Sequence, residues 1–305
     1  MTATAGRARN PVESGMALMV LAMLWVPFID ALAKLLAETL APGQISFVRF
    51  VVQTVLLAPL MLAVRRRFRL AAPGLQALRG LLVALTSLFF FAALAYMPIA
   101  DAVAIAFVQP LMLTLISRFF LGEAVGWRRL SAVAVGFAGA LLVIRPSFAE
   151  TGWPALLPVA AALSYSIYLA LMRRMMQAGD AVEMQFWAGT AAAIIMGLAL
   201  VAGHGTGFAD SVFEVRWPDQ RETLMLLALG AVGTTGQMLV VLAFRRAPAG
   251  VLAPFQYLEI ISATALGLVL FGDFPDLTTW AGVGLVIGSG LYVYHRERMQ
   301  ARAAA

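Results

Sequence analysis

The chain has 305 residues, of which 62% are hydrophobic and 12% charged, and its net charge is +6. A soluble domain has about twice that charged fraction, so the composition excludes an ordinary globular enzyme and predicts an all-α polytopic membrane protein. The sequence contains no cysteine, which excludes disulfides, thiolate catalysis and cysteine-ligated metals.

Ten apolar segments follow one another along the chain, and each is long enough to cross a bilayer as a helix. They span residues 15–37, 43–64, 76–96, 100–121, 127–145, 154–174, 182–202, 222–244, 249–271 and 277–294. A joint near Glu150 divides them into two five-helix halves, residues 15–149 and 150–295, flanked by polar tails at 1–14 and 296–305. The connections are too short to contain a soluble domain.

The first segment has a second interpretation as a cleavable signal peptide. Arg7 and Arg9 precede its apolar run, and Ala31-Leu32-Ala33 resembles a cleavage site. Asp30 lies directly before that site and disfavours cleavage. We therefore expect segment 15–37 to remain as the first helix.

Basic residues are shared unevenly between the two sides of the predicted membrane. One side receives only Arg145, Arg216 and Arg221. The other side receives Arg7, Arg9, Arg65, Arg66, Arg67, Arg69, Arg79, Arg118, Arg128, Arg129, Arg173, Arg174, Arg245, Arg246, Arg296, Arg298 and Arg302. Because positively charged loops stay in the cytoplasm, we expect a multi-pass protein of the bacterial inner membrane with both termini cytoplasmic.

An internal repeat relates the two halves. Residues 98–123 return 150 positions later as residues 248–273, so that Glu123 lies over Asp273 without a gap. Since each half has an odd number of segments, the second half is predicted to enter the membrane in the opposite direction. Inverted repeats that enclose a site near the middle of the bilayer are typical of secondary transporters.

The paired segments YMPIADAVAIAFVQPLMLTLISRFFLGEAVGWRR (96–129) and FRRAPAGVLAPFQYLEIISATALGLVLFGDFPDLTTW (244–280) resemble the two repeats of the EamA-like branch of the drug/metabolite transporter superfamily. The chain looks most similar to the bacterial amino-acid exporters of the YddG type. The resemblance implies ten helices around a central cavity and export of aromatic and other amino acids. It departs from the family pattern at Gly272-Asp273, where the family carries Gly-Glu.

Polar residues near the middle of the paired segments are the first candidates for substrate binding. Glu259 lies beside Gln256 and Tyr257, and its repeat mate is Gln109, which precedes the helix-breaking Pro110. We expect a polar ring in which Glu259 or Gln109 binds a substrate ammonium group, or Glu259 relays a proton. The alternative is that Glu259 only hydrogen-bonds to a neighbouring helix.

Four charged residues form a second group, predicted in the outer third of the membrane. Asp30 and Lys34 are spaced for an ion pair on one helix face, with Arg49 and Asp101 at similar depth. They are expected to close the outer mouth, or to hold a substrate carboxylate on Arg49 or Lys34. The alternative is that Lys34 extends to the lipid headgroups and pairs structurally with Asp30.

Aromatic and amide side chains complete the predicted site. Trp25 belongs to the first segment, and Tyr165 and Tyr168 to the sixth, which is its repeat mate. Ser87 and Gln237 are another mated pair, in the third and eighth segments. An apolar or aromatic substrate side chain is expected to contact such residues.

Glycine and proline indicate how the helices pack and bend. The Gly136-x-x-Gly139 pair and the glycines at 282, 284, 288 and 290 predict close helix packing within or between protomers. Pro27 and Pro158 predict kinks in the first and sixth segments.

The remaining motifs argue against an enzyme. Both histidines, His204 and His295, fall outside the segments, and no P-loop motif is present. The sequence predicts a secondary transporter that exports amino acids by alternating access. Its expected partners are a small-molecule substrate and membrane lipid, with no nucleic acid, metal or cofactor, and a monomer is compatible with it. The alternatives are a multidrug or nucleoside-type metabolite exporter and, less favoured, a membrane-embedded scaffold or enzyme.

Overall fold

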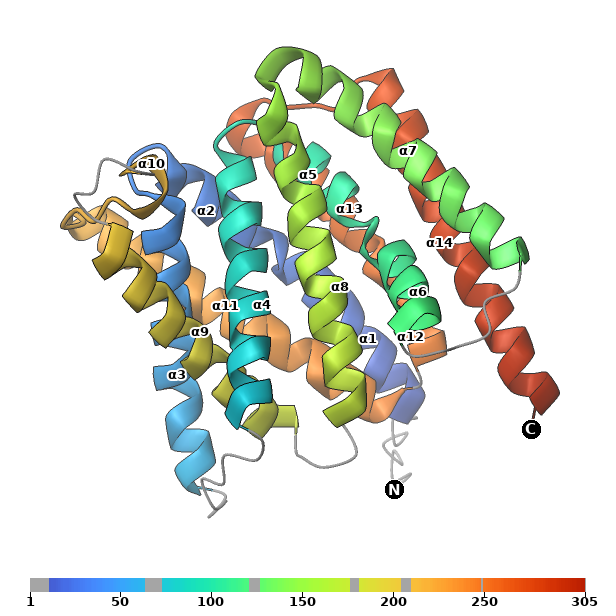
Figure 1. Cartoon of the computed structure of the whole chain (residues 1–305), viewed down its shortest axis with the longest axis horizontal. Helices are drawn as coiled ribbons and strands as arrows, with labels where there is room; N and C mark the ends of the chain where they lie inside the picture. Colours follow the sequence, from blue (N-terminus) through green and yellow to red (C-terminus); the bar gives the residue numbers. More distant parts are fainter. Residues whose placement is uncertain are drawn as a thin grey trace, which may run out of the picture.

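The computed structural model describes residues 11–63, 73–120, 127–175, 181–203, 210–247 and 249–304. Helices and short connections make up these ranges, and no strand occurs within them, as the composition predicts (Figure 1). The helices are α1 (Pro11–Trp25), α2 (Pro27–Ala37), α3 (Pro42–Ala63), α4 (Pro73–Leu94), α5 (Ile99–Ala106), α6 (Gln109–Phe120), α7 (Trp127–Thr151), the 3-10 helix η1 (Trp153–Leu156), α8 (Leu157–Met175), α9 (Ala181–Gly203), α10 (Asp210–Phe213), α11 (Gln220–Arg246), α12 (Ala249–Gln256), α13 (Leu258–Phe271) and α14 (Leu277–Ala304).

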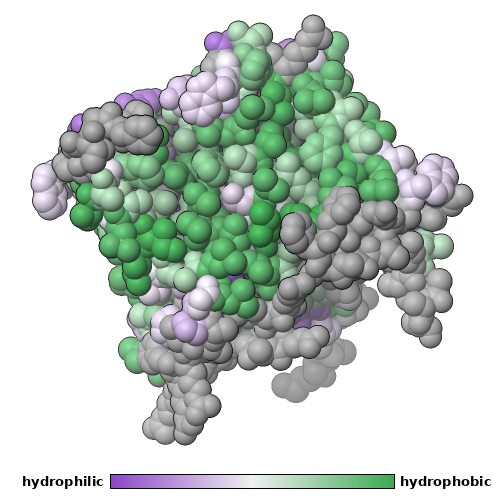
Figure 2. All heavy atoms as spheres, in the orientation of Figure 1, coloured by the Kyte–Doolittle hydropathy of each residue, from purple (hydrophilic) through white to green (hydrophobic). Residues whose placement is uncertain are grey.

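Eight helical stretches of the described chain are long and apolar enough to cross a membrane. They are Pro11–Ala37, Pro42–Leu62, Pro73–Leu94, Ile99–Ile116, Trp153–Met172, Val182–Gly203, Gln220–Arg246 and Pro254–Phe271. Leu130–Ile144 and Leu277–Val293 are apolar but shorter. That these two also cross the membrane, which would give ten crossings, stays a prediction. Figure 2 shows apolar side chains over the middle of the bundle and hydrophilic ones toward its two ends, as a polytopic membrane protein requires.

Three of the spanning stretches are interrupted near their middle. The predicted kink at Pro27 is confirmed as the break between α1 and α2, because proline has no N–H to donate into the preceding turn. Pro110 has the same effect where α5 ends and α6 begins. A third break lies at Tyr257, between α12 and α13. Pro158 lies in the first turn of α8, directly after the 3-10 helix η1, so the change in helix type there is at the start of the sixth segment and not near its middle.

The breaks in the paired segments coincide in the repeat. Phe107 follows the last residue of α5, and Tyr257, 150 positions later, precedes α13. The two rings touch, with centroids 5.3 Å apart. Each half therefore contributes one discontinuous helix to the same place in the bundle.

Contacts between helices also follow the repeat. The first two helices α1 and α2 pack on α11, and their counterpart α8 packs on α4, which is the counterpart of α11. Gly80 of α4 lies against Ala191 of α9, and its repeat mate Gly230 lies against Val52 of α3. The two halves thus exchange equivalent contacts across one shared interface.

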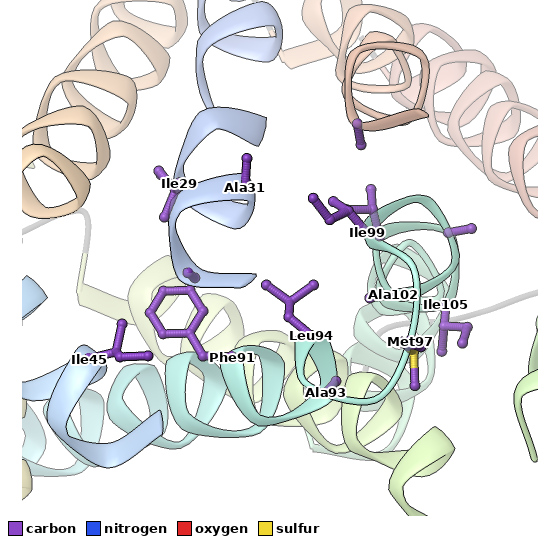
Figure 3. Close-up of a cluster of buried hydrophobic side chains, with 14 of the residues drawn as sticks. Ile29, Ala31, Ile45, Phe91, Ala93, Leu94, Met97, Ile99, Ala102 and Ile105 are labelled. Atoms are coloured by element: carbon purple, nitrogen blue, oxygen red, sulfur yellow. The ribbon is translucent and has the colours of Figure 1, made fainter. Parts of the chain in front are cut away.

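Buried apolar side chains hold α2 against α4 and α5 at one end of the bundle. Figure 3 shows Ile29 and Ala31 on opposite sides of α2, with Phe91 and Leu94 of α4 below this helix and Ile99 of α5 to one side of it. All five are buried. This packing fixes the position of the polar side chains that α2 and α4 carry.

Helices α7 and α14 run side by side along one edge of the bundle (Figure 1). A Cβ added to Gly282 would lie 2.6 Å from the Gly139 carbonyl oxygen and from a methyl group of Val143. Gly284 and Gly288 have open space instead. The glycine pattern therefore marks close packing within the protomer at Gly139 and Gly282, and not at every glycine of α14.

At the start of α14 the Thr279 N–H donates to the Asp276 carboxylate over 2.6 Å, and this bond lowers the pKa of Asp276.

The Gly282→Leu substitution is expected to destabilise the protein by about 1–3 kcal/mol, because the added side chain cannot fit between the two backbones. Gly284→Leu is the matched control, since the same side chain would extend into open space. The thermal denaturation midpoint of the detergent-purified variants measures the difference. Equal midpoints for the two variants would contradict the close packing of α7 and α14.

Candidate functional site

Arg49 of α3 lies near the middle of the bundle and is held there by α4. Its Nη1 donates to Ser87 Oγ over 2.9 Å, and Ser87 Oγ is in turn 3.3 Å from Ser46 Oγ. Gly233 of α11 faces the guanidinium, and a Cβ there would lie in ordinary contact with Arg49 Nε, at 3.4 Å. That Nε is buried and has no hydrogen-bond partner in the described part of the chain. The guanidinium therefore keeps a spare donor.

Two carboxylates lie within electrostatic range of this guanidinium or of each other. Asp30 of α2 is buried, with 6% of its surface exposed, and the charges of Glu259 and Arg49 both act on it. Glu259 belongs to the first turn of α13, directly after the break at Tyr257. The two acids thus come from the two interrupted helices and the cation from α3, and Asp30 lies within electrostatic range of both Arg49 and Glu259.

Tyrosine and glutamine side chains lie near these charged residues. The rings of Tyr165 and Tyr168 on α8 are stacked, with centroids 5.6 Å apart. The Tyr165 side chain lies near Gln237 of α11 and within electrostatic range of Glu259 and Arg49. The repeat mates Ser87 and Gln237 therefore both face the same region.

Six of the predicted site residues are brought together in this way, three from each half. We refer to them as the central cluster: Asp30, Arg49, Ser87, Tyr165, Gln237 and Glu259. Tyr168 adjoins the cluster through its stacked ring.

The polar ring predicted around the paired breaks stays a prediction, because its members are not joined to one another by hydrogen bonds in the described residues. In the described residues no hydrogen bond or ion pair joins the side chain of Gln109 or Gln256 to Glu259. The Gln109 carbonyl accepts a bond from Ser166 Oγ, while the Tyr257 hydroxyl lies against Gly290. Tyr257 lies at the break itself, and Glu259 follows in the first turn of α13.

Trp25 also lies apart from the central cluster. Its Nε1 donates to Thr235 Oγ1 over 2.9 Å, and 39% of its surface is exposed. Thr235 is two residues from Gln237 and so faces another side of α11. Trp25 therefore packs outside the region lined by α8, the helix that corresponds to the first segment in the repeat.

Lys34 does not pair with Asp30, contrary to the expected spacing. Its Nζ lies 2.6 Å from Asp273 Oδ2 and 4.6 Å from the centre of the Phe271 ring. Asp273 follows Gly272, whose positive φ of 73° ends α13 and turns the chain toward α2. The ion-pair partner of Lys34 is thus Asp273 at the end of α13, and not Asp30, which helix spacing predicted.

Asp101 is buried in the first turn of α5, and the structure places no ion pair between it and Lys34 in the described residues. Glu123, the repeat mate of Asp273, lies outside the described residues. The predicted four-residue network at the outer mouth is therefore replaced by the Lys34–Asp273 pair.

Arg79, which its position in the sequence groups with the arginines of the loops, is a further buried polar residue near the site. The side chain is fully buried in α4. Its guanidinium donates to Gln76 Oε1 over 2.6 Å, and more weakly to the Tyr168 hydroxyl and the Met184 carbonyl, over 3.5 and 3.4 Å. A signal was present, since Arg79 lies two helical turns from Ser87 and so shares its face of α4. The described residues contain no group of three or more side chains able to hold a metal.

A protein-family model described as the EamA-like transporter family matches residues 13–145 and again residues 152–294. The chain belongs to the EamA-like transporter family. The predicted branch of the drug/metabolite transporters is therefore confirmed, and the protein is a membrane transporter.

Relatives of this EamA-like transporter carry names with different substrates. An S-adenosylmethionine uptake transporter of Rickettsia bellii is 24% identical over 88% of this chain and 89% of its own. A riboflavin transporter of Rhizobium johnstonii is 29% identical over 74% and 72%. A pseudopaline exporter of Pseudomonas aeruginosa is 28% identical over 90% and 94%. None of these three is named for amino-acid export, so the narrower resemblance to the YddG type stays a prediction.

A solved crystal structure shares the fold of this EamA-like transporter. It is 21% identical, with a TM-score of 0.60 over 91% of this chain and 95% of the other. The overall arrangement of the helices therefore recurs in a second protein.

Proposed function

We propose that this EamA-like transporter exports amino acids, aromatic ones among them, through the central cluster by alternating access. The supporting observation is that Arg49 lies within electrostatic range of Asp30, which Glu259 also affects. A zwitterion carries the complementary charges: Arg49 receives the carboxylate on its spare Nε, and Glu259 with Asp30 receives the ammonium group. The stacked rings of Tyr165 and Tyr168 offer an apolar surface to the side chain.

Inverted repeats supply the mechanism in this proposal. The family model matches the chain twice, and the interrupted helices meet at Phe107 and Tyr257. Two halves of opposite direction can open toward either side around one site, with both termini in the cytoplasm as the basic loops indicate. The same geometry accommodates ten crossings if α7 and α14 each cross once.

One relative supports the substrate class in chemical terms. S-adenosylmethionine carries the carboxylate and ammonium groups of an amino acid, and the central cluster offers a partner for each. A planar molecule without that pair, such as riboflavin, would use the tyrosines but leave the charged residues without a partner. This comparison favours a zwitterionic substrate over a general planar one.

Proteoliposome flux tests the proposal. Labelled phenylalanine is expected to be transported, while phenethylamine, which lacks the carboxylate, and 3-phenylpropionate, which lacks the ammonium group, have values of kcat/KM lower by about tenfold or more, since each loses one charge-assisted interaction. S-adenosylmethionine and riboflavin serve as the alternative substrates. Transport of either of these without transport of any amino acid would contradict the proposed substrate.

A further inference from the structure

Arg79 is a buried charge that the transport of a zwitterion through the central cluster does not use. Its side chain is fully buried, and its hydrogen bonds go to an amide, a hydroxyl and a backbone carbonyl, none of which is charged. Its Nε is buried without a hydrogen-bond partner in the described part of the chain. Among the described residues the guanidinium therefore has no ion-pair partner, and its Nε is a spare donor.

Helix packing does not require a charge at this position. Gly80 and Gly230 occupy equivalent interfaces in the two halves, so Arg79 corresponds to Leu229. Leu229 is fully buried and apolar. An arginine buried within a membrane span costs several kcal/mol unless it is paired or hydrated. Because leucine fills the equivalent place in the other half, retention of the arginine points to a role in binding.

Two aromatic rings lie between Arg79 and the central cluster. The Arg79 guanidinium lies 5.3 Å from the centre of the Tyr168 ring, which stacks on the Tyr165 ring at 5.6 Å. Arg79 and Ser87, the partner of Arg49, are eight residues apart on α4, which corresponds to about 12 Å along the helix axis. Arg79 and the partner of Arg49 thus lie about two turns apart on α4, and the rings of Tyr168 and Tyr165 lie between Arg79 and the central cluster.

We propose that Arg79, with Gln76 and Tyr168, forms a second binding station for the carboxylate of the transported solute. It lies toward the end of the bundle where α4 begins, the end that the basic loops assign to the cytoplasm. A solute leaving the cytoplasm places its carboxylate on Arg79 first. Its side chain then passes along Tyr168 and Tyr165, and the carboxylate moves to Arg49. This inference rests on the proposed function for the direction of transport. It deepens that function by assigning the substrate carboxylate a second binding site.

Arg79→Met and Arg79→Lys test the station in proteoliposomes. Arg79→Met is expected to raise KM for phenylalanine by about tenfold, and Arg79→Lys by less, because lysine keeps the charge without the planar donors. The inhibition constant of phenethylamine, which has no carboxylate, is expected to stay the same. The matched control is Arg246→Met, at the exposed end of α11. Equal losses for phenylalanine and phenethylamine would show a purely structural role.

Direct binding separates the station from the proposed function. Labelled 3-phenylpropionate is titrated onto the detergent-purified wild type and Arg79→Met. If the wild type transports no amino acid but Arg79→Met binds this probe more weakly by about tenfold, the amino-acid proposal is wrong and the station stands. If the wild type transports phenylalanine and Arg79→Met matches it in probe binding and in KM, the station is wrong and the proposed function stands. An Arg79→Met protein with an unchanged thermal midpoint shows that the comparison is made on folded protein.

Discussion

The Arg49→Leu substitution is expected to lower kcat/KM for phenylalanine by about 10- to 100-fold, because a charge-assisted hydrogen bond to the carboxylate contributes about 1.5–3 kcal/mol. The kcat/KM of Arg49→Lys is expected to lie between those of the wild type and Arg49→Leu, since an ammonium group cannot both bond to Ser87 and present a planar second donor. Flux of phenethylamine, which has no carboxylate, is expected to change little. Initial rates in proteoliposomes measure both substrates.

The control for Arg49 must separate transport from folding. Arg246→Leu removes an exposed arginine at the end of α11 and should leave both rates unchanged. Ser87→Ala removes the bond that orients the guanidinium but keeps the charge, so a smaller loss than that of Arg49→Leu is expected. If Arg49→Leu slowed phenylalanine and phenethylamine equally, Arg49 would not be the carboxylate partner.

Breaking the Lys34–Asp273 ion pair is expected to open that end of the bundle. The pair joins α2 to the end of α13, two elements that also carry Asp30 and Glu259 of the central cluster. A charged hydrogen bond worth about 1.5 kcal/mol shifts a two-state equilibrium about tenfold. Asp273→Asn should therefore raise the population open at this end by up to that factor.

Cysteine labelling measures this opening directly, because the chain has no cysteine of its own. Ile29→Cys places a single thiol beside Arg49, where Ile29 now packs against Gly233. A membrane-impermeant maleimide added on the side of the α2–α3 turn should react faster when Asp273→Asn is present. The double variant Lys34→Asp with Asp273→Lys should restore slow labelling.

Asp276→Asn is the control for this experiment. It neutralises a nearby acid that caps α14 and does not join α2 to α13. Labelling that is equally fast with and without the Lys34–Asp273 pair would show that the pair does not hold this end closed.

Local sequence rules predicted the elements and the breaks well. Apolar runs located the helices, and Pro27 and Pro110 located two of the three interruptions. Both depend on interactions within a few residues, since a missing N–H acts on the turn before it. The repeat register also placed Ser87 and Gln237 correctly on the face that meets the central cluster.

The sequence by itself determined that the chain is a helical membrane protein built from two related halves with polar residues at mid-span, because hydropathy, proline and repeat spacing act along the chain. The tertiary structure decided which of those residues meet. It joined Lys34 to Asp273 in place of Asp30, buried Arg79 among α4, α8 and α9, and turned Trp25 away from Gln237. A partner is set by how helices distant in sequence rotate and approach, and small residues such as Gly80 and Gly282 allow the closest approaches.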